Sequence, residues 1–235
     1  FDKNWSQKDF FYYGKFVDKN LVEYPQDKIS KLSNKKNKKI NLGILSADLK
    51  SGHSITFFLK TILSNYNKDE IEVYLISNQI DINSISTEIK NLVHKNIDIS
   101  GLDDLNAFNK IRELNLDIII DVMGYTSRNR IGLFKNRIAK KQVIWMGYCN
   151  TSGLENMDYI ISDPNLIKPD EQKFYSEKVI YLPEIWNCHC GFDFERKENP
   201  PPFINNKYFT FGSFNNPSKM TDDVLNCWSN ILKKV

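Results

Sequence analysis

Apolar and polar positions alternate along most of this chain in a repeating order. Short apolar runs are followed by polar loops, and the loops lead into stretches whose apolar residues recur at helical spacing. The runs that predict buried strands are Ile40–Leu45, Ile71–Ser77, a short one near Ile97, Ile118–Val122, Val143–Met146, Tyr159–Ile161 and Val179–Leu182. Helices are predicted at Ser54–Asn65 with Ser54 as N-cap, near Ser84–Val93, and at Leu105–Leu114. Strands that alternate with helices indicate right-handed βαβ units and a parallel sheet.

The two ends of the chain differ from this middle part. Aromatic residues at helical spacing predict an amphipathic helix with a packed face near residues 5–18, followed by a linker that runs from Pro25 to Lys38. Three consecutive prolines, Pro200 to Pro202, close an irregular stretch and indicate a boundary. Beyond it, Tyr208–Phe214 predicts a new strand and Thr221–Lys234 a new helix with Thr221 as N-cap. We therefore predict an N-terminal helix and linker (1–38), a central α/β domain (39–206) and the opening βα unit of a second domain (207–235).

Composition narrows the protein class. Hydrophobic residues make up 41% and charged residues 26%, which is typical of a soluble globular protein. No apolar stretch reaches the roughly 18 residues of a membrane span, no signal peptide is recognisable, and there is no initiating Met, so we expect a piece of a longer protein away from membranes. The net charge of +3 does not indicate a nucleic-acid partner, and the lysines at 35–39 are typical of a solvated linker.

The four cysteines are too few for a disulfide framework. They favour a reducing compartment, and we expect the cytoplasm. Cys188-His189-Cys190 has a spacing too tight for a zinc site, and no second ligand pair follows it at the usual distance. We therefore expect no bound metal.

Candidate chemistry lies in the loops after the strands, because ligands of open parallel sheets bind beyond the carboxyl ends of the strands. Asp48 and His53 stand between the first strand and its helix, where free N–H groups favour an anion or a sugar hydroxyl. His53 could accept or donate a proton, and Asp48 could orient it or act as the base. The alternative is that both residues only cap the helix and complete a turn.

Two further loops carry glycines and small polar residues. Tyr125 and Thr126 follow the Ile118–Val122 strand, and the loop from Gly147 to Gly153, which includes Thr151, follows Met146. Glycines permit a close backbone approach to a ligand, although ordinary turn chemistry would need the same residues. Farther on, Lys219 is placed to neutralise a phosphate, or is a solvated lysine. No G-x-x-x-x-G-K-[ST] or G-x-G-x-x-G motif and no Asp-x-Asp metal–pyrophosphate pair is present.

Taken in order, several of these segments resemble the catalytic region of the protein O-linked N-acetylglucosamine transferase and SPINDLY family (glycosyltransferase family 41). The similarity spans roughly residues 39 to 235. The matching segments are Gly43–Asp48 with His53, Asp121–Thr126, Trp145–Gly153, Met157–Asp163, Tyr175–Lys178, Phe214–Asn216 with Lys219, and Trp228–Val235.

The resemblance implies the N-terminal Rossmann-like lobe of a GT-B glycosyltransferase, an α/β parallel sheet with helices on both faces, followed by the first βα unit of the second lobe. It implies transfer of a sugar from UDP-GlcNAc to Ser or Thr of an acceptor protein, with inversion and without a metal. Asp48 and His53 would then lie near the donor sugar and the acceptor hydroxyl, and Lys219 would stabilise the leaving diphosphate. Residues implied in substrate binding are Tyr125, Thr126, Met146, Gly147, Thr151 and Asn216.

The chain also departs from the family. The Asp48–His53 loop is one residue longer than in the animal enzyme, Ser127 replaces a lysine, and an upstream histidine is missing at Asp18-Lys19-Asn20. Most of the second lobe and the TPR region are absent, so this polypeptide alone is expected to be inactive. Three alternatives stay open: another donor sugar such as fucose or glucose, an Asn acceptor, or a non-catalytic module that docks a protein.

Overall fold

The computed structural model describes residues 5–25, 38–79, 81, 85–189, 191 and 199–235. The chain divides into two units, residues 1–191 and 192–235, which are described here one at a time. The linker predicted before Lys38 lies mostly outside the described residues. The predicted boundary between residues 206 and 207 stays a prediction.

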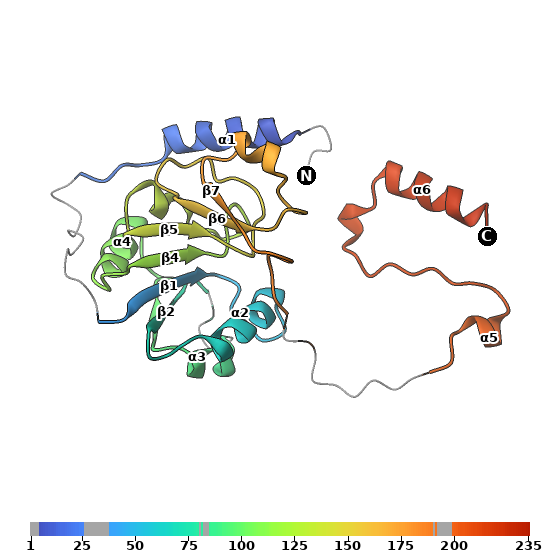
Figure 1. Cartoon of the computed structure of the whole chain (residues 1–235), viewed down its shortest axis with the longest axis horizontal. Coiled ribbons are helices and arrows are strands. Elements are labelled where there is room, and N and C mark those ends of the chain that lie inside the picture. Colours follow the sequence, from blue (N-terminus) through green and yellow to red (C-terminus); the bar gives the residue numbers. More distant parts are fainter. Residues whose placement is uncertain (1–4, 26–37, 80, 82–84, 190, 192–198) are drawn as a thin grey trace. The chain divides into compact units, whose positions relative to one another are not determined.

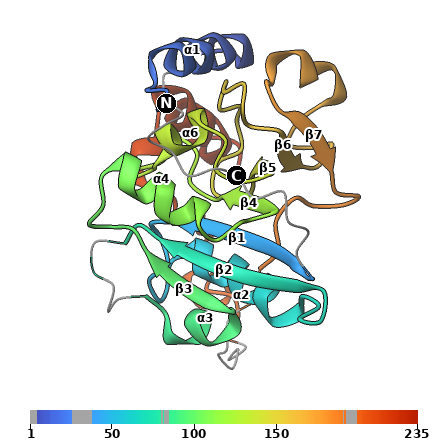
Figure 2. The ribbon, with the colours of Figure 1, turned by 90° about the vertical axis from the view of Figure 1, so that its left-hand side faces the viewer.

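The first unit is built on one seven-stranded sheet in which every neighbouring pair is parallel. Its strands are β1 (Ile40–Ser46), β2 (Ile71–Ser77), β3 (Lys95–Asp98), β4 (Ile118–Asp121), β5 (Lys141–Ile144), β6 (Tyr159–Ser162) and β7 (Lys178–Tyr181). The order across the sheet is β3-β2-β1-β4-β5-β6-β7, which Figure 2 shows in succession. The direction of winding reverses between β1 and β4, and this is where doubly wound sheets bind ligands.

Helices connect and cover these strands (Figure 1). They are α1 (Gln7–Asn20), α2 (Ser54–Asn65), α3 (Thr87–Leu92) and α4 (Asp104–Arg112), together with the 3₁₀ helices η3 (Ile131–Lys135) and η4 (Pro169–Phe174). The bounds of α2 are those predicted, but its N-cap is His53 and Ser54 is already helical. His53 takes this role because its ring nitrogen accepts the free N–H of Ile55, as a serine hydroxyl would.

Two apolar cores lie on opposite faces of the sheet. Because successive strand residues point to opposite faces, Leu45 and its neighbour Ile44 enter different cores. The first core packs the sheet against α4 and η3, with Phe108 and Phe134 fully buried; the second packs it against α2 and α3, with Leu59 buried. Helices on both faces explain why the strands read as nearly continuous apolar runs. This arrangement confirms the predicted α/β, Rossmann-like fold.

Helix α1 exists as predicted, but several of the aromatic residues are exposed. Trp5, Tyr13 and Phe16 are exposed, whereas Gly14 and Asp18 are buried. A side chain at Gly14 would place its Cβ 2.8 Å from the Cα of Gly153, so the two backbones touch. The helix therefore docks through its smallest residue, a close approach that the aromatic spacing did not reveal.

The second unit contains α5 (Phe203–Asn206), the 3₁₀ helix η5 (Pro217–Lys219) and α6 (Asp222–Leu232). Thr221 is the N-cap of α6 as predicted, and its hydroxyl accepts from the Val224 N–H at 3.4 Å. The predicted strand at Tyr208–Phe214 is wrong: this segment is irregular, because no strand among residues 199–235 offers it a hydrogen-bonding neighbour.

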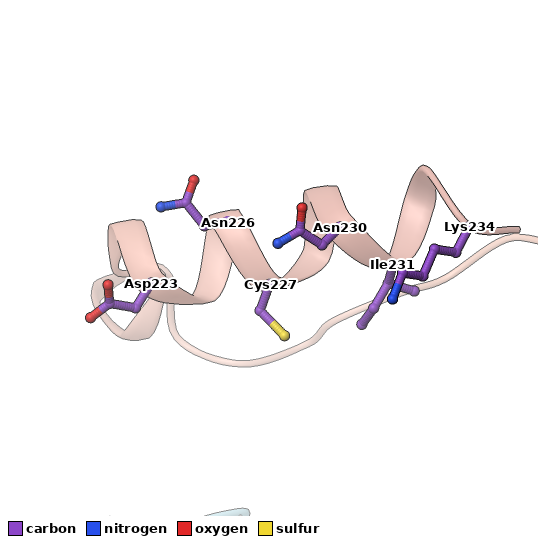
Figure 3. Close-up of a pocket in the computed structure, with 6 residues that line it drawn as sticks. All are labelled: Asp223, Asn226, Cys227, Asn230, Ile231 and Lys234. Carbon is purple, nitrogen blue, oxygen red and sulfur yellow. The ribbon is translucent and has the colours of Figure 1, made fainter.

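No described residue of the second unit is buried. A hollow of about 500 Å³ lies along α6. Figure 3 shows the side chains that line it. Its walls are mostly polar side chains on one face of the helix: Asp223, Asn226, Cys227, Asn230, Ile231 and Lys234. A hollow formed by one exposed helix face lacks the enclosure of a ligand site.

Candidate active site

A pocket of about 380 Å³ opens beyond the carboxyl ends of β1, β4 and β5. It lies at the point where the strand order reverses. Its walls come from the loop after β1, the first turns of α2, and the loops after β4 and β5. The lining residues are Asp48, His53, Ser54, Ile55, Phe58, Val122, Thr126, Ser127, Met146 and Gly147.

Asp48 and His53 form the polar side of this pocket. The Nε2 atom of His53 is 3.8 Å from Oδ1 of Asp48, and the same carboxylate oxygen is 3.3 Å from Nη2 of Arg128. Nδ1 of His53 accepts the Ile55 N–H at 3.3 Å, so this hydrogen bond assigns the proton of a neutral ring to Nε2. In this arrangement His53 presents a donor toward the pocket, and Asp48 presents an acceptor. His53 caps α2 and also lines the pocket, so its role in the reaction stays a prediction.

The loop after β4 is held by a buried carboxylate that the sequence did not mark as a site residue. Asp121 accepts the backbone N–H of Met123 at 2.9 Å and that of Gly124 at 3.0 Å. Burial raises the pKa of Asp121 to about 7, although the two hydrogen bonds act in the opposite direction. These bonds fix the turn that carries Thr126 to the pocket wall. The Thr126 hydroxyl donates to the Met123 carbonyl at 2.8 Å within the same turn.

The loop after β5 approaches the loop after β4 backbone to backbone. A Cβ at Gly147 would lie only 1.7 Å from the carbonyl oxygen of Val122, so no other residue fits there without moving one loop. Met146 precedes it with φ +67°, a conformation that costs a side-chain-bearing residue free energy. The two loops therefore form a single wall. Glycine at 147 is required by the neighbouring loop, whereas the sequence predicted that it permits close approach to a ligand.

Two of the predicted residues of the first unit do not line the pocket. The Tyr125 hydroxyl donates to the Ser152 carbonyl at 2.5 Å, and the buried Thr151 hydroxyl donates to Oε2 of Glu177 at 2.7 Å. Asn216 and Lys219 are exposed residues of the second unit, where Asn216 Oδ1 accepts the Ser218 N–H at 3.0 Å. The pocket thus brings together five of the predicted residues: Asp48, His53, Thr126, Met146 and Gly147.

Sequence reasoning missed other parts of the wall. Ser54, Ile55 and Phe58 lie in the first turns of α2, and helical spacing from His53 could have indicated them. Ser127 also lines the pocket, and the sequence places it in the same candidate loop as Tyr125 and Thr126. Arg128 gave no signal, since its pairing with Asp48 joins two loops far apart in the chain.

No group of three or more His, Cys, Asp or Glu side chains among the described residues is arranged to hold a metal ion. Within the same residues, no helix is long and apolar enough to cross a membrane.

Comparison with known proteins adds an independent observation. The family model described as Glycosyl transferase family 41 matches residues 15–190. The chain is 32% identical over 197 residues to the probable UDP-N-acetylglucosamine–peptide N-acetylglucosaminyltransferase SPINDLY of Arabidopsis thaliana, covering 82% of this chain and 21% of that protein. It is 33% identical over 195 residues to the protein of the same name from Oryza sativa subsp. japonica, covering 81% and 21%. The chain spans about a fifth of the length of these relatives.

A solved structure shows the same fold. A mutant of the Thermobaculum terrenum O-GlcNAc transferase matches with a TM-score of 0.79 at 21% identity, covering 99% of this chain and 44% of that one. The first unit therefore has the Rossmann-like fold of a GT-B lobe. With the family model matching most of the chain, the chain belongs to glycosyl transferase family 41.

Proposed function

We propose that this protein transfers N-acetylglucosamine from UDP-GlcNAc to Ser or Thr hydroxyls of acceptor proteins, with inversion at the sugar carbon. The observation that carries the proposal is the pocket at the switch point of the sheet, where Asp48 and His53 meet the start of α2 in a chain of this family. The relatives are named as probable UDP-N-acetylglucosamine–peptide transferases, which favours this donor and a peptide acceptor.

In the proposed reaction, the acceptor oxygen bonds to the anomeric carbon of the sugar from the face opposite the diphosphate. The bond from that carbon to the diphosphate oxygen breaks, and the diphosphate leaves with the electron pair. The hydroxyl proton must pass to an acceptor, and the Asp48 carboxylate is the acceptor that lines the pocket. His53 donates from Nε2 to an oxygen of the substrate, as its hydrogen bond to the Ile55 N–H implies.

The leaving group gains negative charge in the transition state. We propose that Lys219 of the second unit supplies positive charge there and that Asn216 lies beside the nucleotide, so that no metal is required. The N-terminus of α2 adds a partial positive field at the pocket. Gly147, Thr126 and Met146 line the part of the pocket in which we place the sugar.

Donor and acceptor have alternatives within the same fold. Fucose or glucose in place of N-acetylglucosamine, or Asn in place of Ser and Thr, would use the same pocket. An alternative of another class is a non-catalytic module that docks a protein. The exposed apolar side chains of the second unit, Phe209, Phe211 and Phe214 among them, favour that alternative.

A calorimetric titration separates these possibilities. UDP, UDP-GlcNAc, UDP-glucose and GDP-fucose are titrated into the 235-residue chain and into the full-length gene product. We expect UDP-GlcNAc to bind the full-length product most tightly and the 235-residue chain weakly or not at all. Preference for another sugar nucleotide would replace the proposed donor, and no binding by either protein would leave the docking module as the remaining function.

We further propose that the protein works in the cytoplasm together with a TPR region. The described cysteines Cys149, Cys188 and Cys227 are all free thiols, which suits a reducing compartment. Cell fractionation and the full-length coding sequence test these two points.

A further inference from the structure

A buried carboxylate outside the pocket has no role in the reaction proposed above. Glu177 directly precedes β7 and is 1% exposed. Oε1 accepts from the Ser152 N–H at 2.7 Å and also from the Ser152 hydroxyl, and Oε2 accepts from the Thr151 hydroxyl at 2.7 Å. Among the described residues no Lys, Arg or His forms an ion pair with it. Burying a carboxyl group costs free energy unless it is hydrogen-bonded, and these three hydrogen bonds offset that cost.

The hydrogen bonds of Glu177 organise the loop from Gly147 to Gly153. The Thr151 hydroxyl that donates to Glu177 also accepts the Gly153 N–H at 3.1 Å, and the Ser152 hydroxyl accepts the Leu154 N–H at 3.1 Å. Each hydroxyl thus ties the carboxylate to a backbone group of the loop. One side chain, which lies just before β7, therefore holds residues 151–154 in their conformation.

A second link runs from this loop to the pocket. The carbonyl oxygen of Ser152 accepts from the Tyr125 hydroxyl at 2.5 Å, and Tyr125 directly precedes Thr126 in the pocket wall. The Tyr125 ring also contacts that of Tyr148, with centroids 5.6 Å apart, and Tyr148 follows the pocket residue Gly147. Glu177 is therefore connected, through hydrogen-bonded and packed groups, to the two loops that carry Thr126 and Gly147, although it does not itself line the pocket.

Helix α1 closes this network from the outside. A Cβ on Gly14 would stand 2.6 Å from the Ser152 carbonyl oxygen, and the Tyr13 ring lies 6.1 Å from the Tyr125 ring. Helix α1 thus shields the Ser152 carbonyl from water, which would compete with the Tyr125 hydroxyl for this oxygen.

We infer that Glu177 is a positioning residue for the proposed transfer reaction, and that it acts through Ser152 and Tyr125 to fix the loops that carry Thr126 and Gly147. The inference rests on the proposed function. In this role Glu177 maintains the geometry of the pocket and does not contact the substrate.

The test is Glu177→Gln in the full-length gene product. The glutamine keeps the volume but turns one acceptor oxygen into a donor that faces a hydroxyl. Because small displacements of positioned groups cost large factors in rate, we expect kcat of sugar transfer to fall roughly 10- to 100-fold with little change in the KM for UDP-GlcNAc. Glu155→Gln, an exposed position in the same loop region, is the matched control and should leave kcat unchanged.

A double-mutant cycle with Tyr125→Phe tests the path. If Glu177 acts through the Ser152 carbonyl, the two single losses in kcat overlap, and the double variant is close to the worse single one. Additive losses, or a Glu177→Gln variant that only melts earlier while kcat at a temperature where it is folded equals that of the wild type, would overturn the inference.

Hydrogen exchange separates failure of the inference from failure of the proposed function. If the wild type transfers no sugar, the proposed function fails. The positioning role is then judged on backbone amides at 123–126 and 146–153, which should exchange at least about tenfold faster in Glu177→Gln than in Glu155→Gln. Equal exchange in the two variants would refute it.

Discussion

The two units of this chain have similar apolar patterns and opposite outcomes. In the first unit the apolar runs become neighbouring strands, and their side chains fill two cores. In the second, the run Tyr208–Phe214 precedes a well-capped helix just as β1 precedes α2, yet Phe209 and Phe211 remain exposed. A strand requires a hydrogen-bonded neighbour, and a helix requires a surface to cover. The difference shows that a βα pattern specifies a fold only where other strands stand beside it.

The largest expected effect contrasts one phenylalanine from each unit. Phe108 is fully buried between α4 and the sheet, whereas Phe214 is fully exposed. Phe108→Ala should lower the free energy of unfolding by about 3–5 kcal/mol. Phe214→Ala should change it by less than about 0.5 kcal/mol. Urea denaturation measures both, and similar losses for the two variants would contradict the contrast.

The buried Asp121 gives the first unit a pH dependence. Its carboxyl has an ordinary pKa of 3.8, which applies to the unfolded chain, and one of about 7 when folded. Between these values the folded state keeps a proton that the unfolded state has released. Its contribution to stability is therefore present below about pH 4 and is lost as the pH rises to about 7, on the order of 4 kcal/mol in all.

Asp121→Asn should remove this dependence while adding a constant cost, because the amide can accept only one of the two backbone N–H groups. The free energy of unfolding of both proteins is compared from pH 4 to pH 8. A difference between them that stays constant with pH would show that the carboxyl titrates normally in the folded protein.

One glycine from each unit extends the comparison of the two units to backbone contacts. A methyl group at Gly147 would meet the Val122 carbonyl oxygen, whereas nothing lies within 4 Å of one at Gly212. Gly147→Ala should cost about 1–3 kcal/mol of stability through overpacking, and Gly212→Ala nothing measurable. Thermal unfolding by circular dichroism is the measurement. An unchanged melting temperature for Gly147→Ala would mean that the two loops can separate freely.

The smallest effects compare one candidate catalytic residue from each unit. His53→Asn keeps an N-cap for α2, since Asn is a favoured cap, but removes the imidazole. Lys219→Ala removes an exposed charge on η5, and Lys233→Ala, at the end of α6, is its control. Each of the first two should lower sugar transfer by the full-length product about tenfold at unchanged melting temperature, and the control should not. Retained transfer would leave His53 as a cap and Lys219 as a solvated lysine.

Much of the first unit was predictable because its apolar positions are the ones that the folded structure buries. The bounds of β2 and α2 match the prediction, since Gly, Asn and polar residues mark their ends. The strand predicted at Val143–Met146 lies two residues earlier, at Lys141–Ile144, because ladder pairing with β4 and not apolar content sets its bounds.

The pocket was predictable only in part. Asp48 and His53 could be placed because they follow a strand and open a helix, and both line the pocket. The sequence could not show that Thr151 lies outside the pocket, because its hydroxyl is bound by the carboxylate of Glu177, which only the fold brings near. The docking of α1 through Gly14 was equally hidden, because close packing by a glycine leaves no apolar signal in the sequence.

The contact between Gly14 and Gly153 has a consequence for how such chains can vary. The position of α1 against the loop depends on the absence of side-chain atoms at two places far apart in the sequence. A side chain at either position would meet the backbone of the other and push the helix outward, and no change at the second position would relieve that clash. Each position is therefore expected to stay glycine in every homologue that docks α1 in this way.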